Sequence, residues 1–304
     1  MRSPGPWKRW LIRMVVKAIR DLVASDGYAM ACLAWSPAGP PTAHVVALHG
    51  IQSHAGWYEY SSRRLAEAGC EVLFLDRRGS GANRDRRGDA VHADRLVNDV
   101  AGVLADVRHR RDRDTPGSPV VLLSVSWGGK LAAVTAARRP ELVDGLALLY
   151  PGIKARVRAG WVDRLRLEVA GRLGLVDRLV DLPLRDEWFT ASPDWLRFIG
   201  DDPLTLRQVT VAFMLANRQL DREAAAAPVA VACPVLMMLA GYDRIIDNEA
   251  TRHLFVRFDS SRRLLIEYPE AEHTLEFEAD RDRFIDDLID WIGGVRPSIV
   301  VQDG

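Results

Sequence analysis

Short apolar runs alternate with longer amphipathic segments along most of the chain. Each run is five or six residues long and is closed by turn-forming or polar residues, which is typical of strands buried on both faces of a sheet. The expected strands are 43–48, 71–75, 120–125, 146–150, 235–239 and 264–268. The segments between them carry apolar residues at helical spacing over 57–68, 92–110, 127–138, 248–258 and 280–292. This alternation predicts an α/β fold with a mostly parallel sheet covered by helices.

The alternation fails over 153–232, where the pattern is mostly helical and is punctuated by prolines. We therefore expect a helical cap at 153–232, inserted into a core made of 24–152 and 233–295. Apolar residues of this segment could bind an acyl chain or form the small core of the cap itself, and the sequence leaves both open. They are Trp161, Val162, Leu165, Leu167, Trp188, Phe189, Trp195, Leu196, Phe198, Phe213, Met214 and Leu215.

The N-terminal segment 1–23 carries apolar residues at helical spacing, and five basic residues interrupt them. The interruption is untypical of a signal peptide and favours an amphipathic basic helix. Such a helix could lie on an anionic membrane surface, or it could pack on its own domain or on a partner. The turn-forming residues Ser25, Asp26 and Gly27 predict a hairpin directly after it.

Composition narrows the classes of protein. Lys and Arg number 41, Asp and Glu also number 41, and the formal net charge is zero, so no global field favours nucleic acid. The three cysteines are far apart and form no metal-binding pattern, which is compatible with a cytoplasmic protein that has no metal or cofactor. No apolar run is long enough to span a bilayer, and nothing in the sequence indicates the oligomeric state.

Residues that could carry chemistry follow the predicted strands. After strand 120–125, residues 124–129 read S-V-S-W-G-G. A nucleophile elbow lifts a serine hydroxyl above a sheet and needs small residues two before and two after it. Ser124 and Gly128 occupy these positions, although glycine is usual at the first. We expect Ser126 to be a nucleophile, with an ordinary turn as the alternative.

Two further residues could activate this serine, whose hydroxyl is a poor nucleophile by itself. His273 lies in the loop after strand 264–268 and could act as general base. Asp243 follows strand 235–239 and could orient the imidazole. Asp247 is the rival, but it could instead cap the helix that begins near residue 248.

An oxyanion hole requires backbone N–H donors near the serine. Trp127, directly after the serine, should supply one. The His49-Gly50 turn after strand 43–48 should supply the other, most simply from Ile51. An ordinary strand-ending turn is the alternative for His49 and Gly50.

Together these motifs resemble the α/β-hydrolase superfamily, and within it the monoacylglycerol lipase and lysophospholipase-like group, also described as serine aminopeptidase S33-like. The resemblance covers about 24–292 and rests on H-G-I-Q-S-H at 49–54, D-R-R-G-S-G at 76–81, the motif at 124–129, G-Y-D-R at 241–244 and E-H-T at 272–274. The order Ser, Asp, His is that of the superfamily. The resemblance implies an α/β-hydrolase fold: an eight-stranded, mostly parallel sheet flanked by helices, with a helical cap inserted after strand six.

The resemblance further implies a serine esterase that cleaves small-molecule, acyl-chain esters through an acyl-enzyme intermediate, without metal or cofactor. Three alternatives stay open. One is an acyltransferase or thioesterase with the same triad, and another is a non-enzymatic binding protein on this fold. An aminopeptidase would need acidic groups for the substrate ammonium, such as Asp186, Glu187, Asp201 and Asp202.

Overall fold

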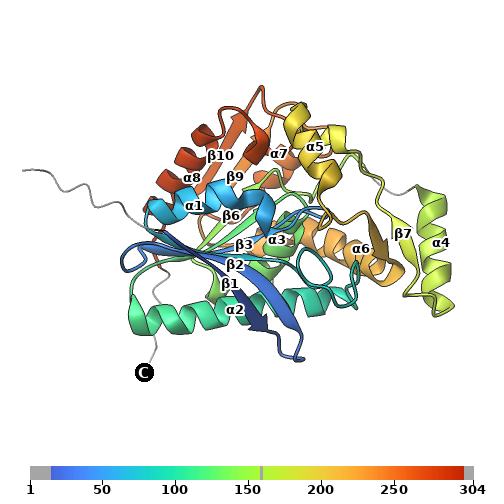
Figure 1. Cartoon of the computed structure of the whole chain (residues 1–304), viewed down its shortest axis with the longest axis horizontal. Helices are drawn as coiled ribbons and strands as arrows, with labels where there is room; N and C mark the ends of the chain where they lie inside the picture. The colour runs from blue at the N-terminus through green and yellow to red at the C-terminus, as the bar shows by residue number, and fades with distance from the viewer. Residues whose placement is uncertain (1–14, 158–159, 298–304) are drawn as a thin grey trace, which may run out of the picture.

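A computed structural model describes residues 15–157 and 160–297 of the chain. Its centre is an eight-stranded sheet in the order β1-β2-β4-β3-β5-β6-β9-β10 (Figure 1). Strand β2 is antiparallel to both neighbours, and all other pairs are parallel. The strands are β1 (Val16–Val23), β2 (Ala29–Ser36), β3 (Ala43–Leu48), β4 (Cys70–Leu75), β5 (Val120–Val125), β6 (Gly145–Leu149), β9 (Val235–Ala240) and β10 (Arg263–Tyr268). The predicted α/β fold is confirmed.

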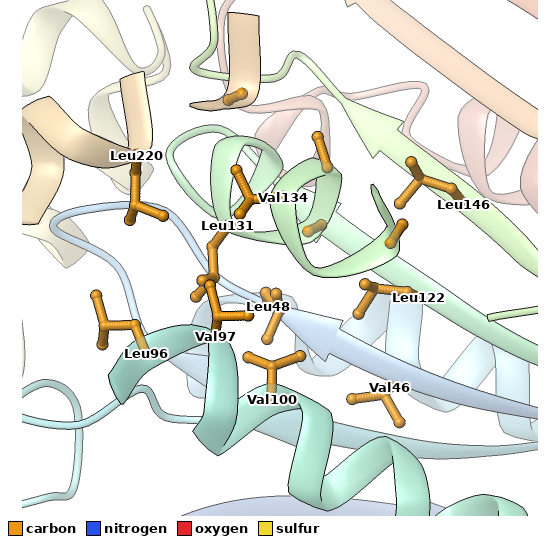
Figure 2. Close-up of a cluster of buried hydrophobic side chains, with 14 of the residues drawn as sticks. Val46, Leu48, Leu96, Val97, Val100, Leu122, Leu131, Val134, Leu146 and Leu220 are labelled. Carbon is orange, nitrogen blue, oxygen red and sulfur yellow. The ribbon is translucent and has the colours of Figure 1, made fainter. Parts of the chain in front are cut away.

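Helices cover both faces of the sheet, so β3, β4, β5, β6 and β9 are buried throughout. Side chains of α2 (Ala93–Asp114), α3 (Gly128–Arg138) and α7 (Asn248–Phe255) join the core on one face. Those of α8 (Asp282–Gly294) and α1 (Glu59–Glu67), which follows the 3₁₀-helix η1 (Ala55–Tyr58), join the core on the other. Figure 2 shows Val97 and Val100 of α2 and Leu131 of α3 facing Leu48 and Leu122 of the sheet. Burying each such side chain stabilises the fold by about 1.5–3 kcal/mol.

The segment between β6 and β9, which we call the cap, is mainly helical. It contains α4 (Trp161–Arg172), β7 (Leu179–Asp181), η3 (Asp186–Trp188), α5 (Pro193–Asp201), β8 (Gln208–Thr210), α6 (Val211–Ala226) and η4 (Ala227–Ala230). Strands β7 and β8 form an antiparallel ribbon that the sequence pattern did not indicate, because β7 has no buried position. Helix α6 packs on α3, with Leu220 directed at the core between them (Figure 2). The remaining short helices are η2 (Pro140–Leu142) and η5 (Leu275–Phe277).

The predicted N-terminal helix is wrong over residues 16–23, which form β1. Side chains from Lys17 to Val23 alternate between exposed and half-buried, which is the period of a strand. All eight residues of β1 pair with β2, and the predicted turn, with Gly27 at φ 83°, closes the hairpin. The backbone pairing that β2 offers outweighs the helical spacing of a segment this short. Residues 1–14 of the predicted helix lie outside the described residues. Among the helices that are described, none is long and apolar enough to cross a membrane.

Candidate active site

Ser126 occupies a strained turn between β5 and α3. Its φ of 50° is unusual for a residue with a side chain, and it directs the hydroxyl above the strand ends. Close backbone packing maintains the turn. A Cβ on Gly128 would lie 2.8 Å from the carbonyl oxygens of Leu48 and His49, and one on Gly152 would lie 2.9 Å from Trp127 Cα. Glycine is therefore required at positions 128 and 152.

The structure brings Ser126, His273 and Asp243 into one hydrogen-bonded chain. His273 Nε2 lies 2.9 Å from Ser126 Oγ, and His273 Nδ1 lies 2.7 Å from Asp243 Oδ2. All three side chains are buried, and Ser126 is 8% exposed. Because an ionised carboxylate only accepts hydrogen bonds, Nδ1 carries the imidazole proton and Nε2 is free to accept from the serine hydroxyl. The geometry allows the serine proton to pass to His273.

Asp243 is held by its own loop. Its Oδ1 accepts the backbone N–H groups of Ile245 and Ile246 at 2.8 Å each, which leaves Oδ2 for His273. The rival, Asp247, is instead the N-cap of α7 and accepts the N–H of Ala250. The structure thus places Asp243 next to the histidine and Asp247 at a helix terminus.

The two predicted oxyanion donors line the same cavity as Ser126. Within the described part of the chain, neither the Ile51 N–H nor the Trp127 N–H donates to another protein group. The Ile51 N–H is oriented by His49. Since Arg77 N–H donates to His49 Nε2 at 3.0 Å, Nδ1 must carry the proton and donates to Gly50 O at 2.7 Å. That carbonyl shares a peptide plane with the Ile51 N–H, so the bond sets the direction of the donor.

His49 has to be neutral to make both of these bonds. Burial, together with the nearby charge of Arg77, lowers its pKa well below the ordinary value. Sequence reasoning treated His49 only as part of a turn. Its second partner comes from the loop after β4, so no local signal could have revealed this role.

The ring of His273 is packed between a core residue and a cap residue. Tyr150, at the end of β6, meets it edge-on with ring centroids 4.9 Å apart, and Phe189 of the cap does so at 5.6 Å. The Thr274 N–H also donates to Phe189 O at 3.0 Å. The cap therefore helps to hold the histidine, a role that the sequence pattern did not indicate.

A cavity of about 450 Å³ opens beside Ser126 between the core and the cap. This volume is in the range of small-molecule sites. Much of its wall is apolar: Ile51, Ile153, Val157, Leu167, Leu182, Pro183, Leu184, Met214, Ile245 and Ile246. The sequence left the role of the apolar cap residues open between acyl binding and cap core. Of these residues, Leu167 and Met214 line the cavity, whereas Phe213 is fully buried and Leu165 is 57% exposed. The apolar residues of the cap are thus divided among the cavity wall, the core and the exposed surface.

One side of the cavity is polar and is formed by α3 and α6. Asn217 Oδ1 accepts from Trp127 Nε1 at 2.8 Å and from Lys130 Nζ at 2.9 Å. The buried Lys130 also forms an ion pair with Asp221. Arg218 and Arg222 continue this face of α6. The cavity therefore has an apolar wall and a polar wall on which basic side chains outnumber acidic ones.

The cap is tied to the oxyanion turn through Asp202. Its Oδ2 accepts from His54 Nε2 at 2.9 Å and from Trp57 Nε1 at 2.8 Å. The Leu206 N–H donates to Gln52 O at 2.9 Å. These bonds link the loop after α5 to the segment that carries Ile51. Asp202 therefore has a structural contact and is not free to bind a substrate.

The other acidic residues considered for an ammonium also lie away from the nucleophile. Asp186 forms an ion pair with Arg207. In the described chain, none of Asp186, Glu187, Asp201 and Asp202 lines the cavity beside Ser126. Nor do the described residues contain a group of three or more His, Cys, Asp or Glu side chains that could hold a metal ion.

Comparisons with known proteins show what this chain is similar to. A family model described as serine aminopeptidase, S33, matches residues 39–280. Human monoglyceride lipase is 29% identical over 264 residues, which are 84% of each chain. The monoacylglycerol lipase of Mycolicibacterium smegmatis is 26% identical over 263 residues, which are 85% of this chain and 90% of the relative. The fold is also similar to the structure of a soluble variant of Saccharomyces cerevisiae monoglyceride lipase in complex with a substrate analogue. The TM-score is 0.78 and the sequence identity is 17%, and the match covers 95% of this chain and 98% of that one.

Proposed function

This chain belongs to the serine aminopeptidase S33 family of serine hydrolases and has the α/β-hydrolase fold, and we propose from this that it cleaves lipophilic monoesters through an acyl-enzyme on Ser126. The single observation that carries the proposal is the hydrogen-bonded chain from Ser126 through His273 to Asp243, which opens onto a largely apolar cavity.

In the proposed mechanism, Ser126 Oγ attacks the ester carbonyl while His273 Nε2 takes the hydroxyl proton. Asp243 stabilises the imidazolium that forms. His273 then returns the proton to the alkoxide that leaves, so an alcohol departs and the acyl group remains on Ser126. A water molecule activated by the same histidine hydrolyses this intermediate and releases the carboxylic acid.

Negative charge develops on the carbonyl oxygen during both steps. We propose that the N–H groups of Ile51 and Trp127 donate hydrogen bonds to this oxygen and stabilise its charge. Neither group has another protein acceptor among the described residues, and both residues line the cavity beside Ser126. Such preorganised donors act strongly in a site from which water is excluded. Loss of one of them typically lowers the rate by about a hundredfold or more.

The cavity walls support an amphiphilic substrate with one acyl chain. Apolar side chains from the cap and from the loop after β9 suit the chain, and the polar face of α6 suits a hydrophilic alcohol. The names of the relatives, monoglyceride lipase and monoacylglycerol lipase, favour a glycerol ester.

The same walls argue against an aminopeptidase. An ammonium group needs a free carboxylate, and Asp221 is the cavity-lining acid in the described chain. It is paired with Lys130, and Arg218 is paired with Glu168, so Lys154 and Arg222 add positive charge. These cations would repel a substrate with a free amino terminus.

The experiment is a rate panel on p-nitrophenyl esters of increasing acyl length and on 1-acylglycerols, with intact protein and Ser126→Ala. Hydrolysis should be lost on substitution, and a fluorophosphonate probe should label Ser126. Ser124→Ala is a matched control, because Ser124 is buried two residues away from Ser126. Within the described chain its hydroxyl donates only to Ala147 O. Absence of labelling in the folded intact protein would contradict the proposal, whereas labelling without ester hydrolysis would favour acyl transfer.

A further inference from the structure

Arg77 is a buried arginine without a carboxylate partner. It directly follows β4 and is 5% exposed. Among the described residues it forms no ion pair, and its Nε and Nη1 atoms have no hydrogen-bond partner. Burial lowers its pKa to about 9. Because a buried unpaired charge is costly, its presence requires an explanation.

Arg78, the next residue, shows what a structural arginine looks like in the same loop. Its guanidinium donates to both oxygens of Asp99, at 2.9 and 2.8 Å, and to Asp26 at 3.0 Å. It also lies over the ring of Tyr28. Arg78 therefore holds the loop in place with its charge neutralised by direct ion pairs. Among the described residues Arg77 has no carboxylate within ion-pair distance, and the adjacent Asp76 compensates its charge only through the longer-range field.

The contacts of Arg77 are directed at the two proposed oxyanion donors. Its Nη2 donates to Ile51 O at 2.6 Å. Its Cζ lies 5.0 Å from the centroid of the Trp127 ring and 4.9 Å from that of Phe213, and these two rings stack on each other at 5.4 Å. The guanidinium thus binds the residue that carries one N–H and packs on the side chain of the residue that carries the other.

The backbone of Arg77 reinforces the same turn. Its N–H donates to His49 Nε2, and this bond fixes the tautomer in which His49 holds the Gly50 carbonyl. The peptide plane before Ile51 is therefore set through the Arg77 backbone, and the plane after it is set through the Arg77 side chain. Residue 51 is held on both sides by one neighbour.

We propose that Arg77 is a positioning residue of the oxyanion hole: its guanidinium fixes the Ile51 and Trp127 N–H groups relative to each other and favours negative charge between them. The proposal rests on the proposed function, in which Ser126 is the nucleophile. Fixed donors next to a cation without a direct ion pair would stabilise the tetrahedral intermediate more than the bound ester, so Arg77 should act on kcat rather than on KM.

The test compares Arg77→Met and Arg77→Lys with Arg78→Met as matched control, all as full-length protein. Rates are expressed per active site after titration to completion with a fluorophosphonate, which removes differences in folded fraction. For Arg77→Met, kcat on a p-nitrophenyl ester should fall about 10- to 100-fold with KM changed less than about twofold. Arg77→Lys should recover part of this loss, because it keeps the charge without the planar fork.

A second measurement separates positioning from general damage. A trifluoromethyl ketone with the same acyl chain forms a tetrahedral oxyanion on the serine, so its affinity should fall by the same factor as kcat in Arg77→Met. In Arg78→Met the thermal midpoint of unfolding should fall. The ratio of the inhibition constant of the ketone to KM should stay at the value of the intact protein. An unchanged kcat in titrated Arg77→Met, or equal losses of ketone affinity and substrate binding, would overturn the proposal. If Ser126→Ala retained hydrolysis, the proposed function itself would fail, and this outcome is distinct from both.

Discussion

Glu276 allows a prediction whose sign and size both follow from burial. It lies in η5, three residues after His273, and is 2% exposed. Its Oε1 accepts the Ser61 N–H at 3.0 Å, and Oε2 has no partner among the described residues. Burial raises the pKa of this carboxyl to about 7, and the Ser61 bond opposes the rise only in part.

The consequence for stability depends on pH in a defined direction. In the unfolded chain the carboxyl has its ordinary pKa of 4.5, whereas in the folded protein it stays protonated up to about 7. The contribution of Glu276 is therefore fully present below 4.5 and is lost as the pH rises through about 7. Since one pKa unit corresponds to about 1.4 kcal/mol, the total loss is on the order of 3 kcal/mol.

Glu276→Gln removes this titration. The free energy of unfolding of the variant should therefore rise relative to that of the intact protein as the pH rises. Whatever offset the new amide introduces is shared by all pH values. We expect the difference in free energy of unfolding between Glu276→Gln and the intact protein to shift by about 2 kcal/mol in favour of the variant between about pH 5 and about pH 8. Urea unfolding at both pH values measures it.

Glu249→Gln, at an exposed position in the first turn of α7, is the control for removing an exposed carboxylate. If Glu276→Gln changes the unfolding free energy equally at both pH values, or gains stability toward acid, then Glu276 is ionised in the folded protein and the reasoning from burial is wrong.

Four other predictions follow from packing and hydrogen bonding. Gly128→Ala should lower ester hydrolysis at least about tenfold and stability by about 1–3 kcal/mol, because its Cβ would meet two backbone carbonyls at 2.8 Å. Gly102→Ala should instead stabilise the protein by about 0.5–1 kcal/mol, because a Cβ added at this position of α2 would have no atom within 4 Å. Urea unfolding measures the stability change of both variants. Asp202→Ala should cost about 2–4 kcal/mol in the same assay, because two largely buried N–H donors lose their acceptor; no change would contradict the tie between cap and core. Met214→Trp should shift the preferred p-nitrophenyl ester to a shorter chain, and an unchanged length profile would show that the chain does not reach α6.

Much of the core could be predicted because its signals are local. The apolar runs 43–48 and 120–125 agree with β3 and β5 residue for residue. Ser126, Asp243 and His273 each follow a different strand, β5, β9 and β10. The carboxyl ends of parallel strands meet at one edge of a sheet, so residues far apart in sequence could be expected to converge there.

The predictions that failed or were missing depend on pairing and contacts that the pattern within one segment does not encode. Residues 16–23 carry helical spacing, yet they form a strand because β2 offers eight residues of pairing. Arg77 and Arg78 are adjacent residues of the same type, but the positions of Asp99 on α2 and of Asp26 in the hairpin turn separate the paired guanidinium from the unpaired one.

The sequence alone determined the strand and helix periodicity, the elbow around Ser126 and the order of the candidate catalytic residues, because each depends on side chains that are close along the chain. Tertiary structure alone decided which walls line the cavity, how Asp202 ties the cap to the core, and that Arg77 contacts Ile51 and Trp127. The physical reason is that a hydrogen bond or ring contact requires a defined position in space within a few ångströms, and for residues separated by tens of positions only the packed fold supplies it.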